Sequence, residues 1–230
     1  LEDFNTRLQE QADEIGRMNT ILQLKNLRAQ MNPHFIFNCM SSIQECILLG
    51  EVDNANRYLA KLSKLLRMVL LYAEEESITL DKELQMLELY LQLESVRLKK
   101  NFEYKIEVDD NLFPDEINIP TLILQPFDEN AIWHGVMGLN GRKGMISVKF
   151  RMKGAGLVCT VEDDGVGRTR SEAMKDKTLP KKSRGISLAT ERLKIINNIM
   201  LSDCRINISD IYPDRTETGT RVEIDIPVMP

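Results

Sequence analysis

The stretch that decides the fold is residues 124–135, which read LQPFDENAIWHG. It lies within residues 120–136, whose apolar spacing predicts a helix. On this helix Asn130 and His134 stand four residues apart and share one face, whereas Glu129 is rotated about 100° from Asn130. The amide oxygen of Asn130 is a hard ligand that suits magnesium. The same pattern is also typical of a buried amphipathic helix with a polar cap.

The sequence on both sides of this helix predicts strands without a regular βαβ alternation. A further helix is expected over residues 185–201, and strands are expected over residues 102–108, 145–151, 157–162, 205–209 and 221–226. This mixture predicts an α+β fold rather than a doubly wound parallel sheet.

A second polar stretch, residues 163–167, reads DDGVG and directly follows a predicted strand. The carboxylate of Asp163 can accept a hydrogen bond from the exocyclic amine of adenine, and the two glycines allow a sharp bend. Residues 166–184 then lack apolar periodicity and carry seven Lys and Arg against two acids. They predict a mobile cationic lid, after which Gly185 opens a helix whose first amides would face phosphates. Taken alone, the Asp-Gly pattern is equally typical of a plain turn.

The first half of the chain predicts a helical hairpin. Apolar residues alternate at spacings of three and four from Leu1 to Leu22, which predicts a coiled coil over residues 1–24. The same alternation continues beyond this point on two helices separated by Gly50, with Ala29, Ile36, Cys39, Ile43 and Cys46 on the first and Ala55, Leu59, Leu62, Leu66, Val69 and Ala73 on the second. Leu65, Met68, Leu70 and Leu71 widen the second face, which predicts a four-helix bundle in a homodimer. A third helix over residues 80–98 precedes a change of texture at Asn101, where we expect a domain boundary.

A third stretch, residues 32–38, reads NPHFIFN and places His34 on the outward face of the first helix. In order and spacing, the three stretches together resemble the LytS/YehU-type sensor histidine kinases over roughly residues 25–230. The resemblance implies a dimerising domain at residues 25–99 that displays a phosphoaccepting His34. It also implies an α/β-sandwich ATP-binding domain of the GHKL (Bergerat) type at residues 100–230, with the lid at 166–184.

The resemblance further implies ATP and Mg²⁺ as cofactors and assigns roles to individual residues. Asn130 would be the magnesium ligand, Asn38 would orient the ring of His34, and Glu129 is a further catalytic candidate. The implied nucleotide-binding residues are Asn130, His134, Asp163, Gly165, Gly167, Lys181, Lys182, Arg184, Gly185 and Thr220. ATP-hydrolysing relatives carry a glutamate where Pro126 stands, and a proline cannot act as a base, which favours transfer to His34 over bulk hydrolysis.

Three residues depart from the family pattern. Trp133 replaces a lysine, Ser187 replaces a glycine and Asp128 replaces an apolar residue. These departures leave a second hypothesis open, namely that the chain is a catalytically weak dimeric scaffold that binds nucleotide. A serine kinase of the anti-sigma-factor type fits the second and third stretches but leaves the helical half and His34 unexplained.

Composition excludes several other classes of protein. A net charge of −5, from 30 Lys and Arg against 35 Asp and Glu, argues against a nucleic-acid partner. Four scattered cysteines without a CxxC pair favour a reducing, cytoplasmic setting, and two histidines cannot build a histidine-rich metal site. Because the chain begins at Leu1, we expect a fragment whose upstream sensor or membrane segment lies elsewhere. The expected function is the kinase portion of a two-component sensor that phosphorylates His34 and passes the phosphate to an aspartate of a response-regulator receiver domain.

Overall fold

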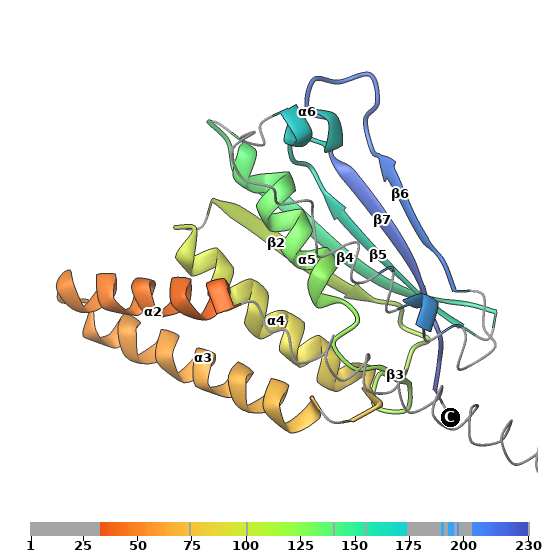
Figure 1. The fold of residues 1–230 in the computed structure, drawn as a ribbon, viewed down its shortest axis with the longest axis horizontal. Helices are drawn as coiled ribbons and strands as arrows, with labels where there is room; N and C mark the ends of the chain where they lie inside the picture. Colours follow the sequence, from red (N-terminus) through yellow and green to blue (C-terminus); the bar gives the residue numbers. More distant parts are fainter. Residues whose placement is uncertain are drawn as a thin grey trace, which may run out of the picture.

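The helical hairpin expected in the first half of the chain is present in the computed structural model (Figure 1). The structure describes residues 33–73, 75–99, 101–139, 141–154, 156–173, 190, 193–195, 197 and 204–229 of the 230-residue chain. The coiled coil expected over residues 1–24 lies outside the described residues.

The hairpin consists of α2 (Pro33–Leu48) and α3 (Val52–Tyr72). The turn between them contains Gly50 at φ 76°, a left-handed backbone conformation that glycine adopts without steric cost. One face of α2 is buried through Phe35, Cys39 and Ile43, which follow one another at intervals of four residues. The burial of Cys39 and Ile43 agrees with the seam expected on this helix, whereas Ile36 and Cys46 are only partly buried and Phe35 is buried instead.

On α3 the predicted seam residues Ala55, Leu62 and Val69 are buried, but at two other positions the buried residue comes one earlier, Tyr58 in place of Leu59 and Leu65 in place of Leu66. Leu59 was expected on the seam but is 44% exposed, whereas the neighbouring Tyr58 is 4% exposed. The reason is that α3 packs against two helices at once. The Tyr58 hydroxyl donates to the carbonyl oxygen of Leu93 at 3.1 Å and lies 3.4 Å from the sulfur of Cys39. This one side chain therefore joins three helices. The buried residues of α3 are Ala55, Tyr58, Leu62, Leu65 and Val69.

Helix α4 (Leu80–Arg97) lies between the hairpin and the sheet, as Figure 1 shows. It contacts α3 and α2 on one side and strand β2 on the other. A helix covered on both sides needs apolar residues around most of its circumference, and α4 meets that need. Its buried residues are Leu80, Glu83, Met86, Leu87, Leu89, Tyr90, Leu91, Leu93 and Glu94.

The sheet has five strands in the order β2-β4-β5-β7-β6. Strand β2 pairs in parallel with β4, and the other neighbours pair antiparallel. The strands are β2 (Phe102–Val108), β4 (Gly144–Lys153), β5 (Gly156–Asp163), β6 (Ile206–Asp210) and β7 (Thr220–Ile226). These bounds confirm the expected strands to within two residues at each end, and the α+β class with them.

The two faces of the sheet differ in chemistry. On β4, Ile146, Val148 and Phe150 are at most 2% exposed and face the helices. The alternate residues on the outer face form cross-strand ion pairs, such as Arg151 with Glu223 at 2.8 Å and Lys153 with Asp225 at 3.1 Å. The alternation therefore fixes one face as core and leaves the other charged and solvated.

The helix expected over residues 120–136 is shorter and less regular than predicted. A strand, β3 (Asn118–Pro120), pairs with β1 (Ser77–Thr79) and takes up the first residue of that range, Pro120. Leu122 then adopts φ 55°, so α5 (Gln125–Asn130) begins five residues later than predicted. After α5 come a π-helical turn, η1 (Ala131–Gly135), and a 3₁₀ turn, η2 (Val136–Gly138).

The segment expected as a lid begins with an ordered part. Val166 is 2% exposed, and α6 (Arg168–Ala173) follows it and contacts η1. Arg168 pairs with Asp210 of β6 at 3.0 Å. The remainder of the predicted lid, residues 174–184, lies outside the described residues. Of the helices that the structure describes, none combines the length and the apolar character needed to cross a bilayer.

Candidate nucleotide site

The candidate site is built around the π-helical turn that follows Asn130. In η1 the amide of Val136 donates to the carbonyl of Ala131, five residues earlier, in addition to that of Ile132. π-turns inside α-helices are frequent at functional sites because they change the direction of the residues that follow. The regular α-helix expected through Asn130 and His134 therefore ends at Asn130, and His134 lies in the π-turn.

Gly135 is pressed against the carboxylate of Asp163. A Cβ atom added at Gly135 would lie 2.4 Å from the Oδ1 atom of Asp163. A Cβ atom added at Gly165 would lie 2.2 Å from the carbonyl carbon of Gly135, and the amide of Val166 donates to the oxygen of Gly135 at 3.3 Å. The turn after β5 therefore packs directly against the end of the π-turn. The contact is so close that only glycine fits at positions 135 and 165.

Asp163 is the last residue of β5 and is 3% exposed. Its Oδ1 atom accepts a hydrogen bond from the amide of Gly165 at 2.9 Å. Burial raises its pKa to about 7, the Asp164 charge adds to this, and hydrogen bonds from the Gly165 amide and from Thr220 oppose it. Thr220, paired with Asp163 across β5 and β7, therefore contacts the residue expected to read adenine.

Asp164, the neighbour of Asp163, has a structural part. It accepts hydrogen bonds from the Met145 amide at 2.7 Å and from the Arg142 guanidinium at 2.6 Å. The same guanidinium pairs with Glu217 at 2.9 Å. These contacts fasten the turn to β4 and to the loop before β7, which leaves Asp163 as the aspartate that faces the π-turn.

Gly167, the last glycine of this turn, packs against the loop that precedes β7. It has φ 79°, and an added Cβ atom would lie 1.7 Å from the Oγ1 atom of Thr218. Both facts require glycine, because any other residue would have a strained backbone at this φ and its Cβ would collide with Thr218. The bend expected at this position is therefore present, and α6 begins directly after it.

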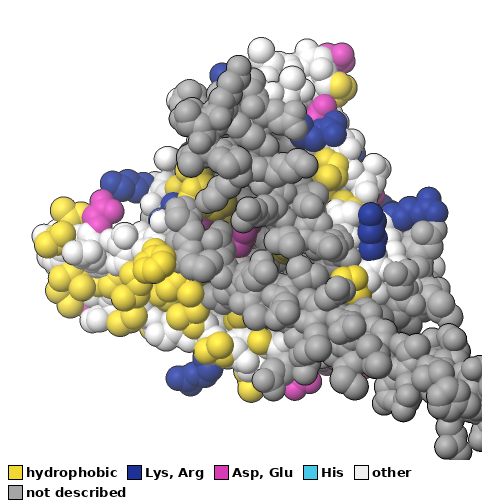
Figure 2. Space-filling model, viewed as in Figure 1, with side chains coloured by type: hydrophobic (Ala, Val, Ile, Leu, Met, Phe, Trp, Pro, Cys, Tyr) yellow, Lys and Arg dark blue, Asp and Glu magenta, His cyan; other side chains and the backbone are white. Residues whose placement is uncertain are grey.

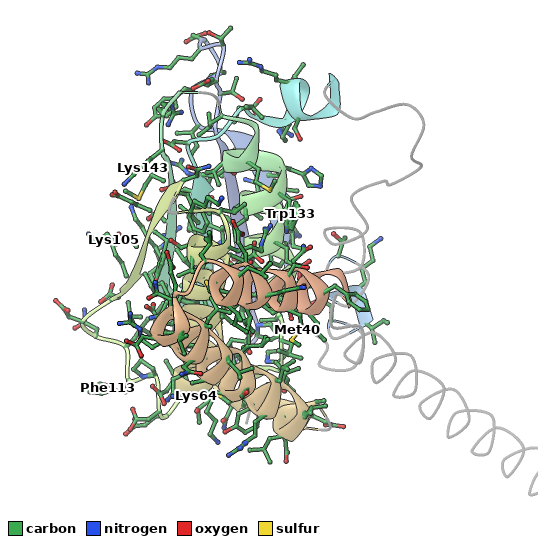
Figure 3. All side chains as sticks on the ribbon, turned by 90° about the vertical axis from the view of Figure 1, so that its left-hand side faces the viewer. Met40, Lys64, Lys105, Phe113, Trp133 and Lys143 are labelled. Carbon is green, nitrogen blue, oxygen red and sulfur yellow. The ribbon has the colours of Figure 1, made fainter. Side chains whose placement is uncertain are left out.

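Trp133 lies in the π-turn, is partly buried and is labelled in Figure 3. The guanidinium carbon of Arg97 lies 4.6 Å from the centroid of its ring, a cation–π contact. Arg97 also pairs with the fully buried carboxylate of Glu94. Trp133 stands where the resembled family pattern has lysine, and the cation beside its ring, Arg97, comes from α4.

The structure brings together only part of the predicted site. Asn130 ends α5 and His134 lies in η1. Asp163 ends β5, Thr220 begins the neighbouring β7, and Gly165 and Gly167 lie in the turn after β5. Glu129 accepts a hydrogen bond from the Gln125 amide at 2.9 Å, and Asn38 is half-buried on α2. The side chain of His34 and residues Lys181, Lys182, Arg184, Gly185 and Ser187 lie outside the described residues.

Gly135 was missed by the sequence analysis, although its signal was present. A glycine inside an apolar helical pattern often marks a close approach of two backbones. Here that approach brings the π-turn onto Asp163.

The donor atoms suit a magnesium ion held mainly by phosphates. The described residues contain no cluster of three or more His, Cys, Asp or Glu that could hold a metal by itself. Mg²⁺ commonly takes only one or two protein oxygens and completes its shell with phosphate and water. The amide oxygen of Asn130 is consistent with such a partial role.

Comparison with known proteins gives the family. A family model described as "Histidine kinase" matches residues 22–102. This match spans 81 of the 230 residues, and together with the relatives that follow it places the chain in the histidine kinase family. The chain is 28% identical over 228 residues to "Sensor protein LytS" of Oceanobacillus iheyensis, which covers 94% of this chain and 36% of the relative. It is 34% identical over 157 residues to "Sensor protein LytS" of Staphylococcus epidermidis, which covers 68% of this chain and 26% of the relative.

These similarities confirm the resemblance to LytS-type sensor histidine kinases that the three stretches indicated. The LytS relative from Oceanobacillus iheyensis and the "Sensor histidine kinase YpdA" of Escherichia coli each align with 94% of this chain. The chain spans about a third of the length of these relatives. Among solved structures, the "Catalytic domain of histidine kinase ThkA" aligns with 67% of this chain and 99% of its own, with a TM-score of 0.46 at 18% identity. That score is too low to support an inference.

We predict that Gly135→Ala disrupts the site. The added methyl group would collide with the buried carboxylate of Asp163, so the free energy of unfolding should fall by roughly 1–3 kcal/mol. Chemical denaturation measures this loss. Gly156→Ala is the matched control, since the nearest atom to its Cβ is 3.6 Å away, and it should cost no more than about 0.5 kcal/mol. Equal effects of the two substitutions would contradict the close contact.

We also predict that Asp163 makes stability depend on pH. Its pKa is about 7 in the folded protein and about 4 when unfolded, so the stabilisation from its protonated form is complete below about pH 4. That stabilisation should be lost as the pH rises to about 7, at about 1.4 kcal/mol per pH unit. Asp163→Asn cannot ionise and should lack this slope. If the free energies of unfolding of the two proteins change with pH in the same way across this range, the raised pKa is refuted.

Proposed function

We propose that the chain is the kinase portion of a two-component sensor and that it uses ATP with magnesium to phosphorylate His34. The observation that carries the proposal is the contact of Gly135 with Asp163. It unites two stretches that lie 28 residues apart, one with an oxygen ligand for magnesium and the other with an acceptor for adenine. Family membership supports the same activity.

Each residue has a defined part in this proposal. The ionised carboxylate of Asp163 accepts a hydrogen bond from the amine of adenine, and Asn130 contributes an oxygen to the magnesium shell. Magnesium supplies charge neutralisation at the phosphates. A ring nitrogen of neutral His34 forms the bond to the γ-phosphorus while the bond to the β–γ bridging oxygen breaks and ADP leaves. The phosphoryl group then passes from His34 to an aspartate of a receiver domain.

The arrangement of the longer protein belongs to the same proposal. Residues 1–24 would form a signalling coiled coil, residues 25–99 would display His34 and residues 100–230 would bind the nucleotide. The portion described would work in the cytoplasm, joined to an upstream sensor or membrane segment. Helix α4 contacts both the hairpin and the sheet, which supports its use as the route between the two functional parts.

A homodimer through α2 and α3 is the second element of the proposal. Figure 2 shows hydrophobic side chains gathered over the hairpin. The exposed apolar residues there are Phe37, Met40, Ile47, Leu48, Leu49, Val52, Leu59, Leu70 and Leu71. Monomeric proteins rarely leave such a continuous apolar surface in water, so a second copy of the hairpin is the natural cover.

We predict that radiolabelled ATP with magnesium labels the protein at His34 through an acid-labile, alkali-stable phosphorus–nitrogen bond. His34→Gln should abolish the label, and Asn130→Ala should reduce it strongly because a magnesium ligand is lost. Gln44→Ala changes an exposed side chain on the same helix and should label normally. Full labelling of His34→Gln would overturn the assignment. If the unaltered protein binds nucleotide but acquires no label, the result would favour the alternative that the chain is a catalytically weak scaffold.

We predict twice the 26.4 kDa chain mass by light scattering. Leu59 and Leu70 are eleven residues apart and share one exposed face of α3, so replacing both with Glu should give monomers. Lys64→Glu also adds an acid to α3, at an exposed position that Figure 3 labels, but outside this apolar face, and should leave the dimer intact. Monomers in the unaltered protein would exclude the proposed interface.

A further inference from the structure

The turn that leads into α5 is held by a buried carboxylate from α4. Glu83 is 3% exposed, and its oxygens accept hydrogen bonds from the backbone amides of Leu122 at 3.0 Å and Leu124 at 3.3 Å. Leu122 adopts φ 55°, a conformation that costs a leucine free energy unless its surroundings enforce it. The two hydrogen bonds to Glu83 help to enforce it, and they thereby fix the place where α5 begins.

A second side chain of α4 reaches the same segment on the other side of Asn130. The guanidinium carbon of Arg97 lies 4.6 Å from the ring centroid of Trp133 in η1, and a cation over an indole face is an attractive contact. Arg97 is itself held in place, because its Nε atom donates to both carboxylate oxygens of Glu94 at 3.1 Å. That carboxylate is fully buried and the Arg97 side chain is 13% exposed. The guanidinium therefore meets the ring from a fixed position.

The two contacts leave nearly the same face of α4 and bracket Asn130. Glu83 and Arg97 are 14 residues apart in the sequence. On an α-helix this separation is about 21 Å along the axis, and it returns the side chain to within about 40° of the same direction. Along the other segment the contacts fall at residues 122–124 and at Trp133, so Asn130 lies between them.

Between these two contacts the helices are not closely joined. A cavity of about 30 Å³ lies there, and its wall includes Met86 and Tyr90 of α4 and Gln125 and Asp128 of α5. The Tyr90 hydroxyl and both carboxylate oxygens of Asp128 have no hydrogen-bond partner among the residues that the structure describes. These groups therefore do not join the two helices, and the position of α5 relative to α4 depends on the contacts at the two ends.

We propose that Glu83 and Arg97 are positioning residues that fasten the Asn130 segment to α4 at both of its ends and thereby fix the place of Asn130 in the nucleotide site. Glu83 acts through the backbone amides before α5, and Arg97 acts through the ring of Trp133 after it. A segment held at two points follows a displacement of α4 as one unit. The effect on nucleotide binding rests on the proposed function, whereas the fastening of the segment to α4 does not.

The contact of Glu83 is tested by the affinity for magnesium ATP. Glu83→Ala removes both acceptors and should weaken binding by about tenfold, whereas Glu83→Gln keeps one carbonyl acceptor and should weaken it less. Tyr104→Phe is the matched control, because it removes a 2.8 Å hydrogen bond that joins α4 to β2 through Glu88. It should leave the affinity within about twofold of that of the unaltered protein. Unchanged affinity in both Glu83 variants, or an equal loss in Tyr104→Phe, would overturn the proposal.

The contact of Arg97 is tested without leaving a buried charge unpaired. Because removal of Arg97 alone would strand the fully buried carboxylate of Glu94, both residues are replaced by glutamine in one variant. This variant should weaken the binding of magnesium ATP by about fivefold. Trp133→Leu should weaken it by a similar factor, whereas Trp133→Phe keeps an aromatic face and should restore most of the affinity.

Combining these changes shows whether they break one contact or two. Trp133→Leu added to the glutamine variant should cause no further loss, because Arg97 and Trp133 act through the same contact. Losses that simply multiply would show that the two residues act separately, and the role of Arg97 would then be refuted.

Hydrogen exchange gives a readout that needs no nucleotide. In Glu83→Ala and in Trp133→Leu, the backbone amides of residues 125–136 should exchange faster than in the unaltered protein, while those of β5 should not change. Glu83→Gln takes the place of Glu83→Ala if the latter does not fold. Exchange rates that equal those of the unaltered protein would overturn the fastening. If the unaltered protein binds no ATP, the proposed function fails, and the exchange rates still decide whether α4 holds this segment.

Discussion

The contact between Gly135 and the buried carboxylate of Asp163 is the constraint on which the site depends. Because Gly135 has no side chain, the end of the π-turn can approach the last residue of β5 closely. That approach buries Asp163, and burial raises its pKa to about 7. The backbone geometry of one helical turn therefore sets the proton affinity of the residue expected to recognise adenine.

Helix α4 extends this constraint to the rest of the molecule. Its Glu83 holds the turn that starts α5, its Arg97 lies on Trp133, and the carbonyl of its Leu93 accepts the hydroxyl of Tyr58 from the hairpin. A displacement of α2 and α3 would thus reach the π-turn through packed side chains. These contacts connect the helical hairpin with the π-turn, which supports the proposed use of α4 as the route between the two parts.

The sequence predicted those parts of the fold whose burial follows a simple period. Strands such as β2 (Phe102–Val108) and β7 (Thr220–Ile226) were predicted to within one residue, because one face is apolar and the other charged. Features set by tertiary contacts were missed. The three-residue strands β1 and β3 have no period of their own, and the start of α5 depends on amides held by Glu83 from a distant helix.

The candidate site, like the fold, was predicted from the sequence only in part. Asp163 and its glycines were found because their residue types carry the chemistry, but Gly135 and the π-turn depend on a contact between segments. Asp128 was noted only as a departure from a family pattern, and its burial is a result of tertiary packing that the sequence pattern does not show. Periodicity identifies which face is buried, and it does not reveal which polar group is buried without a partner.

The most direct test of this account is a carbon-13 NMR titration of the Asp163 carboxyl group, with and without magnesium ATP. The account predicts a midpoint at about pH 7 in the free protein and a lower midpoint when the nucleotide is bound, because the adenine amine would stabilise the carboxylate. A midpoint near the ordinary value of about 4 that ATP does not change would contradict it.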